Sequence, residues 1–203
     1  MKLYGAPMPA PNPRRVRVFL AEKGIDLPET PLDLRKREHK STEHRERNSL
    51  GQVPTLELDD GETISETVAI CRYFEELHPE PSLFGTTALE KAHVDMWIRR
   101  VEFILTQPVG NFWRHAHPLT AALLTQYKDF GESNRAAYVA AQKWLDGELA
   151  ERDFLTGSAF TMADICALST VDFANWIGLP IDPERTNLRA WHQRVSARPS
   201  ALA

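Results

Sequence analysis

The four residues Gln52-Val53-Pro54-Thr55, which precede a short apolar run, limit the possible folds more than any other part of the sequence. Proline cannot donate a hydrogen bond to a sheet ladder, so this proline belongs at the first residue of a strand. An X-Pro bond is also the one peptide bond whose cis form costs little, about 0.5–1 kcal/mol. A cis bond at Val53-Pro54 would turn the backbone N–H and C=O of Val53 outward, where an extended, peptide-like ligand could pair with them.

A hairpin and a helix are predicted directly after this step. Asp59-Asp60-Gly61 indicates the turn, and the second strand ends at Glu66-Thr67, where a helix begins. The first amides of a helix have no intrahelical partner, so such an end is suited to an anion. The stretch from Gly51 to Thr67 therefore predicts backbone pairing at one point and a carboxylate pocket at another, an arrangement that suits a small acidic peptide.

The residues before the hairpin predict a strand–helix–strand unit. Lys2-Leu3-Tyr4 begins a strand, and a loop from Gly5 to Pro13 follows, whose prolines make it too stiff to be helical. A helix is predicted from Arg14 to Lys23 and a second strand from Glu29 to Leu34. In such a unit the two strands are parallel. Residues 35–47 are dense in charge and histidine, which predicts an exposed, mobile helix and loop.

The sequence changes character after the third helix, which is predicted to end before Pro79. Residues 79–87 are rich in proline and predict a linker, and no strand signal follows them. We therefore expect an α/β domain over residues 1–78 and an all-helical domain over residues 88–203.

Four features organise the expected helical domain. An apolar stripe predicts a long helix from about Ala88, which Pro108 should kink or break. A further helix is predicted over residues 133–152, with Ala137, Ala141, Trp144, Leu145 and Leu149 inward. Thr161 followed by Asp164 resembles a capping box, and the apolar helix after it should occupy the centre of the bundle. A last helix is predicted to end before Pro199, with three apolar residues at helical spacing: Leu188, Trp191 and Val195.

Charge and cysteine content exclude several classes of function. The net charge of −4, with both signs interspersed, argues against nucleic acid or an anionic membrane as a partner. No apolar run approaches the roughly 20 residues of a membrane span, and the first residues are not typical of a signal peptide. Cys71 and Cys166 lack CxxC spacing, which indicates buried, reduced thiols and a cytoplasmic protein.

Three motifs in this order resemble the cytosolic glutathione S-transferase family, whose fold is a βαβ–ββα thioredoxin-like domain followed by an all-α helical-bundle domain. They are Asn48–Leu56, Ile64–Ile70 and Phe160–Ile165, and the resemblance covers essentially the whole chain. Phe112–Pro118 and Asn12–Val16 are similar to the atypical bacterial and fungal group of that family.

The resemblance implies a role for each matching position. Val53, presented by Pro54, should pair through its backbone with the cysteinyl part of glutathione. Glu66 and Thr67 should hold the γ-glutamyl ammonium and carboxylate. The glycyl end of glutathione should contact Lys40 and Gln52. Glutathione is then a co-substrate, and no metal is implied. The family also leads us to expect a homodimer, in which the first domain of one chain meets the helices of the other.

The group that activates the thiol differs from the one in better-known classes of the family. Those classes use a tyrosine, serine or cysteine around the first loop, and the loop 5–13 contains none of them. Asn12 is the best loop candidate, because its amide can donate to sulfur and the adjacent helix dipole favours a thiolate, although it can equally be a helix cap. His115 matches a histidine implicated in the atypical group, and it can equally be a packing residue. Tyr4 lies in the strand and is the less favoured donor.

These observations predict a glutathione transferase that joins the thiolate to a small hydrophobic electrophile bound near Phe112 and Trp113. Two alternatives remain. The first is another glutathione-dependent chemistry, such as ether cleavage, dehalogenation or peroxide reduction. The second is a non-catalytic binding member of the family.

Overall fold

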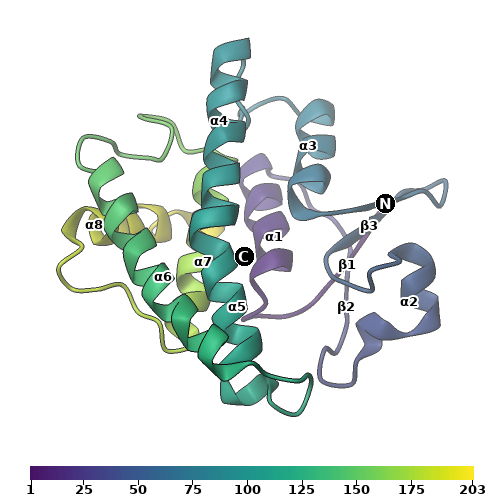
Figure 1. Ribbon diagram of the computed structural model, residues 1–203. Helices are drawn as coiled ribbons and strands as arrows, with labels where there is room; N and C mark the ends of the chain where they lie inside the picture. Colours follow the sequence, from purple (N-terminus) through teal and green to yellow (C-terminus); the bar gives the residue numbers. More distant parts are fainter. The chain divides into compact units, whose positions relative to one another are not determined.

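The computed structural model describes all residues, 1–203, and divides them into two compact units. The first unit comprises Met1–Leu83 together with Pro199–Ala203, and the second comprises Phe84–Arg198. The elements of both units are labelled in Figure 1. No helix combines the length and the apolar character needed to cross a membrane.

The first unit is built on a four-stranded mixed sheet of order β2-β1-β3-β4. Its strands are β1 (Lys2–Gly5), β2 (Glu29–Pro31), β3 (Thr55–Glu57) and β4 (Thr63–Ser65). β1 and β2 are parallel, whereas β1 with β3 and β3 with β4 are antiparallel. The predicted βαβ–ββα order is confirmed, and the Val53-Pro54 bond is cis.

Helices lie on both faces of this sheet. The helices α1 (Pro11–Lys23) and α3 (Thr67–Leu77) pack on each other and lie on one side, and α2 (Thr42–Arg47) lies on the other (Figure 1). The core of the first side is formed by fully or almost fully buried apolar residues: Leu3, Val16, Phe19, Leu56, Ile70 and Phe74. Tyr4 alternates with Leu3 along β1, so its ring faces α2, where it meets His44 edge-on at 6.1 Å between centroids.

Two expectations for this unit were wrong. The first helix begins at Pro11 rather than Arg14, because a proline in the first turn lacks only an N–H that would have no intrahelical partner. The helix ends at Gly24, whose φ of 64° is the left-handed conformation that glycine adopts readily. Residues 35–47 are not uniformly exposed: His44 retains only 2% of its accessible surface.

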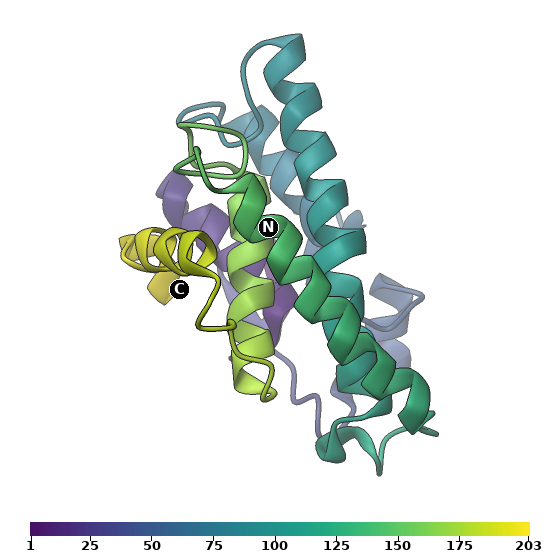
Figure 2. The same cartoon turned by 60° about the vertical axis from the view of Figure 1, so that its left-hand side comes forward.

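The second unit is helical. Figure 2 shows a long rod formed by α4 (Ala88–Arg100), the π-helical segment η2 (Val101–Thr106) and α5 (Gln107–His115), with α6 (Lys128–Glu148) running alongside α5. Pro108 does not end this rod. The residues directly before it form π-helical hydrogen bonds instead of α-helical ones. This local change lets the rod continue through a proline, which has no N–H to donate.

The helix α7 (Met162–Trp176) is central, as predicted, because 12 of its 15 residues are buried. The last helix, α8 (Thr186–Ser196), packs on α6 and α7 through buried Leu188, Trp191 and Val195. The face of α6 differs from the prediction, since Ala137 is exposed and Tyr138 is the buried residue of that turn.

Candidate functional site

The strand register brings three segments of the first unit to one end of the sheet. Tyr4 lies opposite Thr55, so β1 ends where β3 begins. Thr55 also lies opposite Ser65, so β4 ends there as well. The loop after β1 leading to α1, the Val53-Pro54 step and the Glu66-Thr67 step therefore leave the sheet at this end. We call it the glutathione edge, after the ligand that the sequence resemblance leads us to expect there.

The backbone of Val53 is available at the glutathione edge. Val53 lies beyond the last residue pair of the β1–β3 ladder, and no backbone hydrogen bond of the chain uses its N–H or its C=O. Its side chain is half-buried. An extended peptide placed against this residue would find one donor and one acceptor without partners, as backbone pairing at a strand edge requires.

The start of α3 lies beside Val53 at the same edge. Glu66 is the residue before the helix, its side chain is exposed, and its φ of 71° is uncommon for a residue other than glycine. Thr67 is the first helical residue and is 7% exposed. No side chain of the protein caps this helix and its first turn carries no acidic residue, so its first amides are available to an anion.

The segment that carries Lys40 lies against Leu50 and Gly51, the two residues that precede Gln52. The Lys40 ammonium donates to the carbonyl of Leu50 at 2.9 Å. Gly51 has a φ of 56°, and a Cβ at this position would lie 2.8 Å from the carbonyl oxygen of His39 and 3.1 Å from Cδ of Lys40. Glycine thus lets the Lys40 segment approach closely, while the Gln52 side chain remains exposed.

Asn12 and Tyr4 occupy different environments. Asn12 is exposed in the first turn of α1, whose N-cap is Ala10, so it is not the cap of that helix. The Tyr4 hydroxyl donates to Glu57 at 3.0 Å, and Arg47 donates to the same carboxylate oxygen at 2.8 Å. Arg47 and then Tyr4 lower the pKa of Glu57 through these hydrogen bonds. The Tyr4 proton is therefore engaged inside the protein.

The residues predicted to hold the electrophile lie in the second unit and have separate surroundings. Phe112 is buried, with the Arg135 guanidinium 4.6 Å from its ring centroid. Trp113 belongs to a cluster with His117, Phe173 and Trp176, at centroid distances of 4.7, 5.4 and 5.6 Å respectively. Burial lowers the pKa of His117, which favours its neutral form in this cluster.

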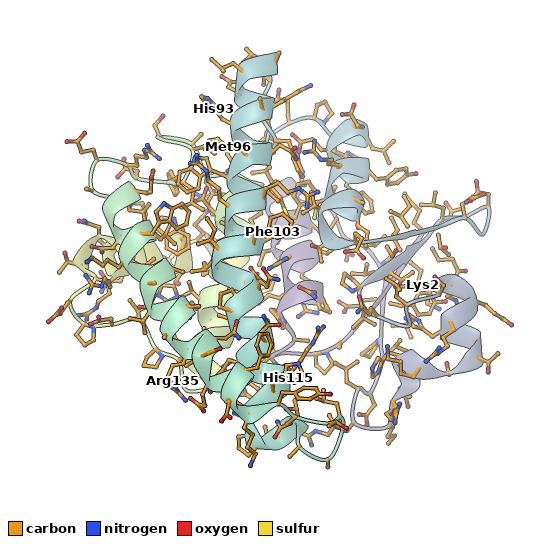
Figure 3. The ribbon with its side chains drawn as sticks, viewed as in Figure 1. Lys2, His93, Met96, Phe103, His115 and Arg135 are labelled. Atoms are coloured by element: carbon orange, nitrogen blue, oxygen red, sulfur yellow. The ribbon has the colours of Figure 1, made fainter.

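His115 lies away from that cluster, at the end of the rod opposite His93 (Figure 3). Its half-buried ring stands 5.6 Å from the ring of Tyr127 and 5.5 Å from that of Phe130. Its Nδ1 accepts a hydrogen bond from the backbone N–H of Tyr127 at 3.4 Å. In this contact Nδ1 is the acceptor, so Nε2 is the ring nitrogen left for a second hydrogen bond.

Three residues around the glutathione edge were not predicted to contribute to it. His44, Asn48 and Thr55 all donate to the backbone carbonyl of Gln52, at 2.8, 3.1 and 3.2 Å. Asn48 and Thr55 fall within the Asn48–Leu56 motif, although neither was given a role there. His44 gave no signal, because it lies in a segment whose charges predict an exposed surface.

The fold and this edge define a two-domain protein of thioredoxin-like class with a helical second domain. Family models for the glutathione S-transferase N-terminal domain and C-terminal domain match residues 10–77 and 116–199. The chain is 38% identical to glutathione S-transferase 2 of Saccharomyces cerevisiae over 98% of its own length and 87% of the relative's.

Solved structures agree with this likeness. The crystal structure of Gtt2 from Saccharomyces cerevisiae matches with a TM-score of 0.94 at 37% identity, covering 100% of this chain and 99% of that one. A glutathione S-transferase domain-containing protein from Marinobacter aquaeolei matches with a TM-score of 0.92 at 37% identity, covering 98% and 99%. The chain belongs to the glutathione S-transferase family, in agreement with the atypical fungal and bacterial group expected from its motifs.

Proposed function

We propose that this enzyme activates the thiol of glutathione and conjugates it to a small hydrophobic electrophile. The observation that carries the proposal is the glutathione edge, where the unused backbone groups of Val53 lie beside the uncapped start of α3. These features match the chemistry of a tripeptide, which offers a backbone-like cysteinyl unit and terminal carboxylates.

Each part of glutathione then has a partner. The cysteinyl unit pairs with Val53 beside Pro54, and the γ-glutamyl carboxylate is received by the amides and hydroxyl of Thr67. Glu66 holds the γ-glutamyl ammonium, and Lys40 with Gln52 holds the glycyl end. The electrophile binds near Phe112 and Trp113, of which the half-buried Trp113 offers the more accessible ring.

Thiolate formation needs only modest help. A free thiol has a pKa of about 8.5, and lowering it to about 6.5 requires about 2.7 kcal/mol of thiolate stabilisation. One charge-assisted hydrogen bond and a helix N-terminus can supply this. We assign these contributions to Asn12, in the first turn of α1, and a further contribution to His115.

Binding to glutathione-agarose, followed by rates with a panel of electrophiles and peroxides, tests the function. Retention on the resin with conjugation of aryl or alkyl halides supports the proposal. Retention with peroxide reduction, or with ether cleavage or dehalogenation whose final product carries no glutathione thioether, would replace conjugation by another glutathione chemistry. Retention without any turnover would identify a binding protein, and failure to bind glutathione would contradict the glutathione edge as its site.

Asn12→Ala and His115→Ala should each slow conjugation about ten-fold, which corresponds to a contribution of about 1.4 kcal/mol. Asn12→Ala should raise the thiol pKa, so its loss of rate should be larger below pH 7. His115→Ala removes a candidate general acid or base, so it should also flatten the rate against pH. The matched control is Tyr4→Phe, which should keep the rate because the Tyr4 proton already serves Glu57. If Tyr4→Phe alone abolishes turnover, the tyrosine is the donor.

We also propose a homodimer in the cytoplasm. Leu89, Met96 and Phe103, spaced seven residues apart on the α4–η2 rod, are 66%, 38% and 62% exposed, and Figure 3 shows Met96 and Phe103 spaced along it. Such a stripe is suited to a second copy. Cys71 and Cys166, buried and outside any disulfide, are compatible with a reducing compartment.

Phe103→Asp should convert the dimer to a monomer in sedimentation velocity, because it places a charge on the stripe at one of its two most exposed apolar residues. Leu123→Asp is the matched control, since Leu123 is 56% exposed outside the rod. A Phe103→Asp protein that sediments as a dimer would place the contact elsewhere.

A further inference from the structure

The carbonyl oxygen of Gln52 is held by more donors than any ordinary loop carbonyl needs. It accepts from Nε2 of His44 at 2.8 Å, from Nδ2 of Asn48 at 3.1 Å and from Oγ1 of Thr55 at 3.2 Å. This carbonyl belongs to the peptide group whose nitrogen is that of Val53. The three bonds therefore act on the plane of the Val53 N–H, one of the two groups proposed to pair with glutathione.

His44 makes the shortest of these bonds, and its ring is the best fixed of the three side chains. It is 2% exposed, it packs edge-on against Tyr4, and its own backbone N–H is bound by the Ser41 hydroxyl that caps α2. A carbonyl oxygen can only accept, so the ring must carry its proton on Nε2. Nδ1 is buried and has no hydrogen-bond partner in the protein, so the Gln52 carbonyl is the only hydrogen-bond partner of this imidazole.

We propose that His44 is a positioning residue for glutathione: its Nε2–H···O=C bond to Gln52 orients the peptide group between Gln52 and Val53 at the glutathione edge. The proposal rests on the proposed function only for the identity of the ligand. His44 itself touches no ligand. It acts through the main chain, so its removal should disturb glutathione binding and leave the chemical step almost intact.

Because Asn48 and Thr55 also donate to the Gln52 carbonyl, removing His44 tests how this peptide group is oriented and does not leave its oxygen without a hydrogen bond. Without His44, the Gln52 carbonyl still accepts from Asn48 and Thr55, so no buried acceptor is left without a partner. Asn48 also donates to Oγ1 of Thr55 at 3.2 Å, and Leu50 N–H binds the Asn48 side-chain oxygen. These two residues hold the loop together internally, whereas His44 is the donor that ties it to the middle of α2.

Two variants separate the effect of the His44–Gln52 hydrogen bond from the effect of packing by the His44 ring. His44→Phe keeps a buried aromatic ring and removes the donor, and His44→Gln keeps an N–H donor at a similar reach and removes the ring. The first readout needs no ligand: the steady-state ¹H–¹⁵N NOE of the Val53 amide. We expect a rigid amide in the wild type and in His44→Gln, and a clearly lower NOE in His44→Phe, with a melting temperature unchanged within about 2 °C. A Val53 amide that is equally rigid in all three proteins overturns the proposal.

The second readout is kinetic. For His44→Phe we expect the KM for glutathione to rise about five-fold and kcat at saturating glutathione to stay within two-fold of wild type, with His44→Gln recovering most of the KM. Equal KM values in the wild type and His44→Phe overturn the proposal, as do equal rises in both variants, which would indicate ring packing. If the wild type binds no glutathione, the proposed function fails, while the NOE comparison still decides the role of His44.

Discussion

Replacing Asp164 with alanine should lower the free energy of unfolding of the helical unit by at least about 3 kcal/mol. Asp164 is fully buried at the start of α7 and gathers hydrogen bonds from three parts of this unit. Its Oδ1 accepts from the backbone N–H of Leu155 at 3.0 Å and from the indole N–H of Trp191 at 2.9 Å. Its Oδ2 accepts from the backbone N–H of Thr161 at 3.0 Å and from the Thr161 hydroxyl at 3.3 Å. Alanine would leave three buried N–H donors without an acceptor, each costing about 1–3 kcal/mol.

Urea unfolding monitored by tryptophan fluorescence measures this loss. Trp191→Phe is the first control: it removes one donor, leaves the carboxylate its other partners and opens a small cavity in place of the fully buried indole, so it should cost less than Asp164→Ala. Asp153→Ala is the second, because the Asp153 side chain is 65% exposed in its pair with Arg194 and should contribute less than about 1 kcal/mol. An Asp164→Ala protein as stable as Asp153→Ala would mean that the buried network is not stabilising.

Lowering the pH should increase the folding stability of the wild type relative to Asp164→Asn, which has no carboxyl group at this position. Burial raises the pKa of Asp164 to about 6, and the four donors oppose this shift without cancelling it. Between about pH 4 and pH 6 the folded protein therefore binds more protons at this site than the unfolded chain, so its stability falls as the pH rises through this window. The stability advantage of the wild type over Asp164→Asn should be larger at pH 4 than at pH 7, by up to about 3 kcal/mol.

The sequence predicts the elements whose cause is local. The Asp59-Asp60-Gly61 turn and the Thr161–Asp164 start of α7 follow from the chemistry of neighbouring residues, and the structure has both. Pro54 was expected to be the first residue of a strand, and it directly precedes that residue, since β3 begins at Thr55. The periodicity of apolar residues likewise predicts α7 and α8. Boundaries were less accurate: α6 begins at Lys128 rather than Ser133, because residues 128–132 carry a single large apolar side chain, Phe130, and so show no helical periodicity.

Contacts between distant residues could not be predicted in this way. The Arg14 guanidinium donates to the carbonyl of Ala201, 187 residues later, at 2.9 Å, and this bond helps to place the last residues of the chain in the first unit. His44 is the clearest example at the site itself. A histidine between Glu43 and Arg45 gives the pattern of a solvated surface. Its burial is explained only by the fold, which brings the Gln52 carbonyl within hydrogen-bond distance of its ring.

The register of the sheet supplied what the motifs alone could not. The motifs assign Val53 and Glu66 to one ligand through their local chemistry and the family resemblance, and Asn12 through its amide and its position at a helix start. Pairing of Thr55 with both Tyr4 and Ser65 provides a physical reason to consider them together, because three chain segments then leave the sheet at the same end. The roles of these residues toward glutathione are the part that mutation must test.

Glu66→Ala should weaken glutathione binding by ten-fold to about 100-fold, because hydrogen bonds to charged groups contribute about 1.5–3 kcal/mol. Thermal stability should not fall. The Glu66 side chain is exposed and does not cap α3, and its φ of 71° disfavours any residue with a Cβ. Glu66→Gly should therefore lose the same affinity while being as stable as the wild type or more so. Calorimetric titration and a thermal melt measure the two effects separately.

Glu62→Ala is the matched control for charge. Glu62 is an exposed acid in the turn between β3 and β4, at the end of the hairpin opposite the glutathione edge. It should leave the affinity within two-fold of wild type, because its distance from the glutathione edge allows only a screened, long-range effect. A similar loss in Glu62→Ala and Glu66→Ala would indicate a general electrostatic effect and would contradict a specific ammonium partner.

A double-mutant cycle with a modified ligand identifies the group that Glu66 holds. The ligand is a glutathione analogue in which the γ-glutamyl ammonium is replaced by hydrogen, leaving a glutaryl group. The wild type should bind this analogue at least ten-fold more weakly than glutathione, whereas Glu66→Ala should bind the two ligands with similar affinity. The coupling free energy between residue and ammonium should then exceed about 1 kcal/mol. Independent losses from the residue change and the ligand change would place the ammonium elsewhere and leave Glu66 without its proposed role.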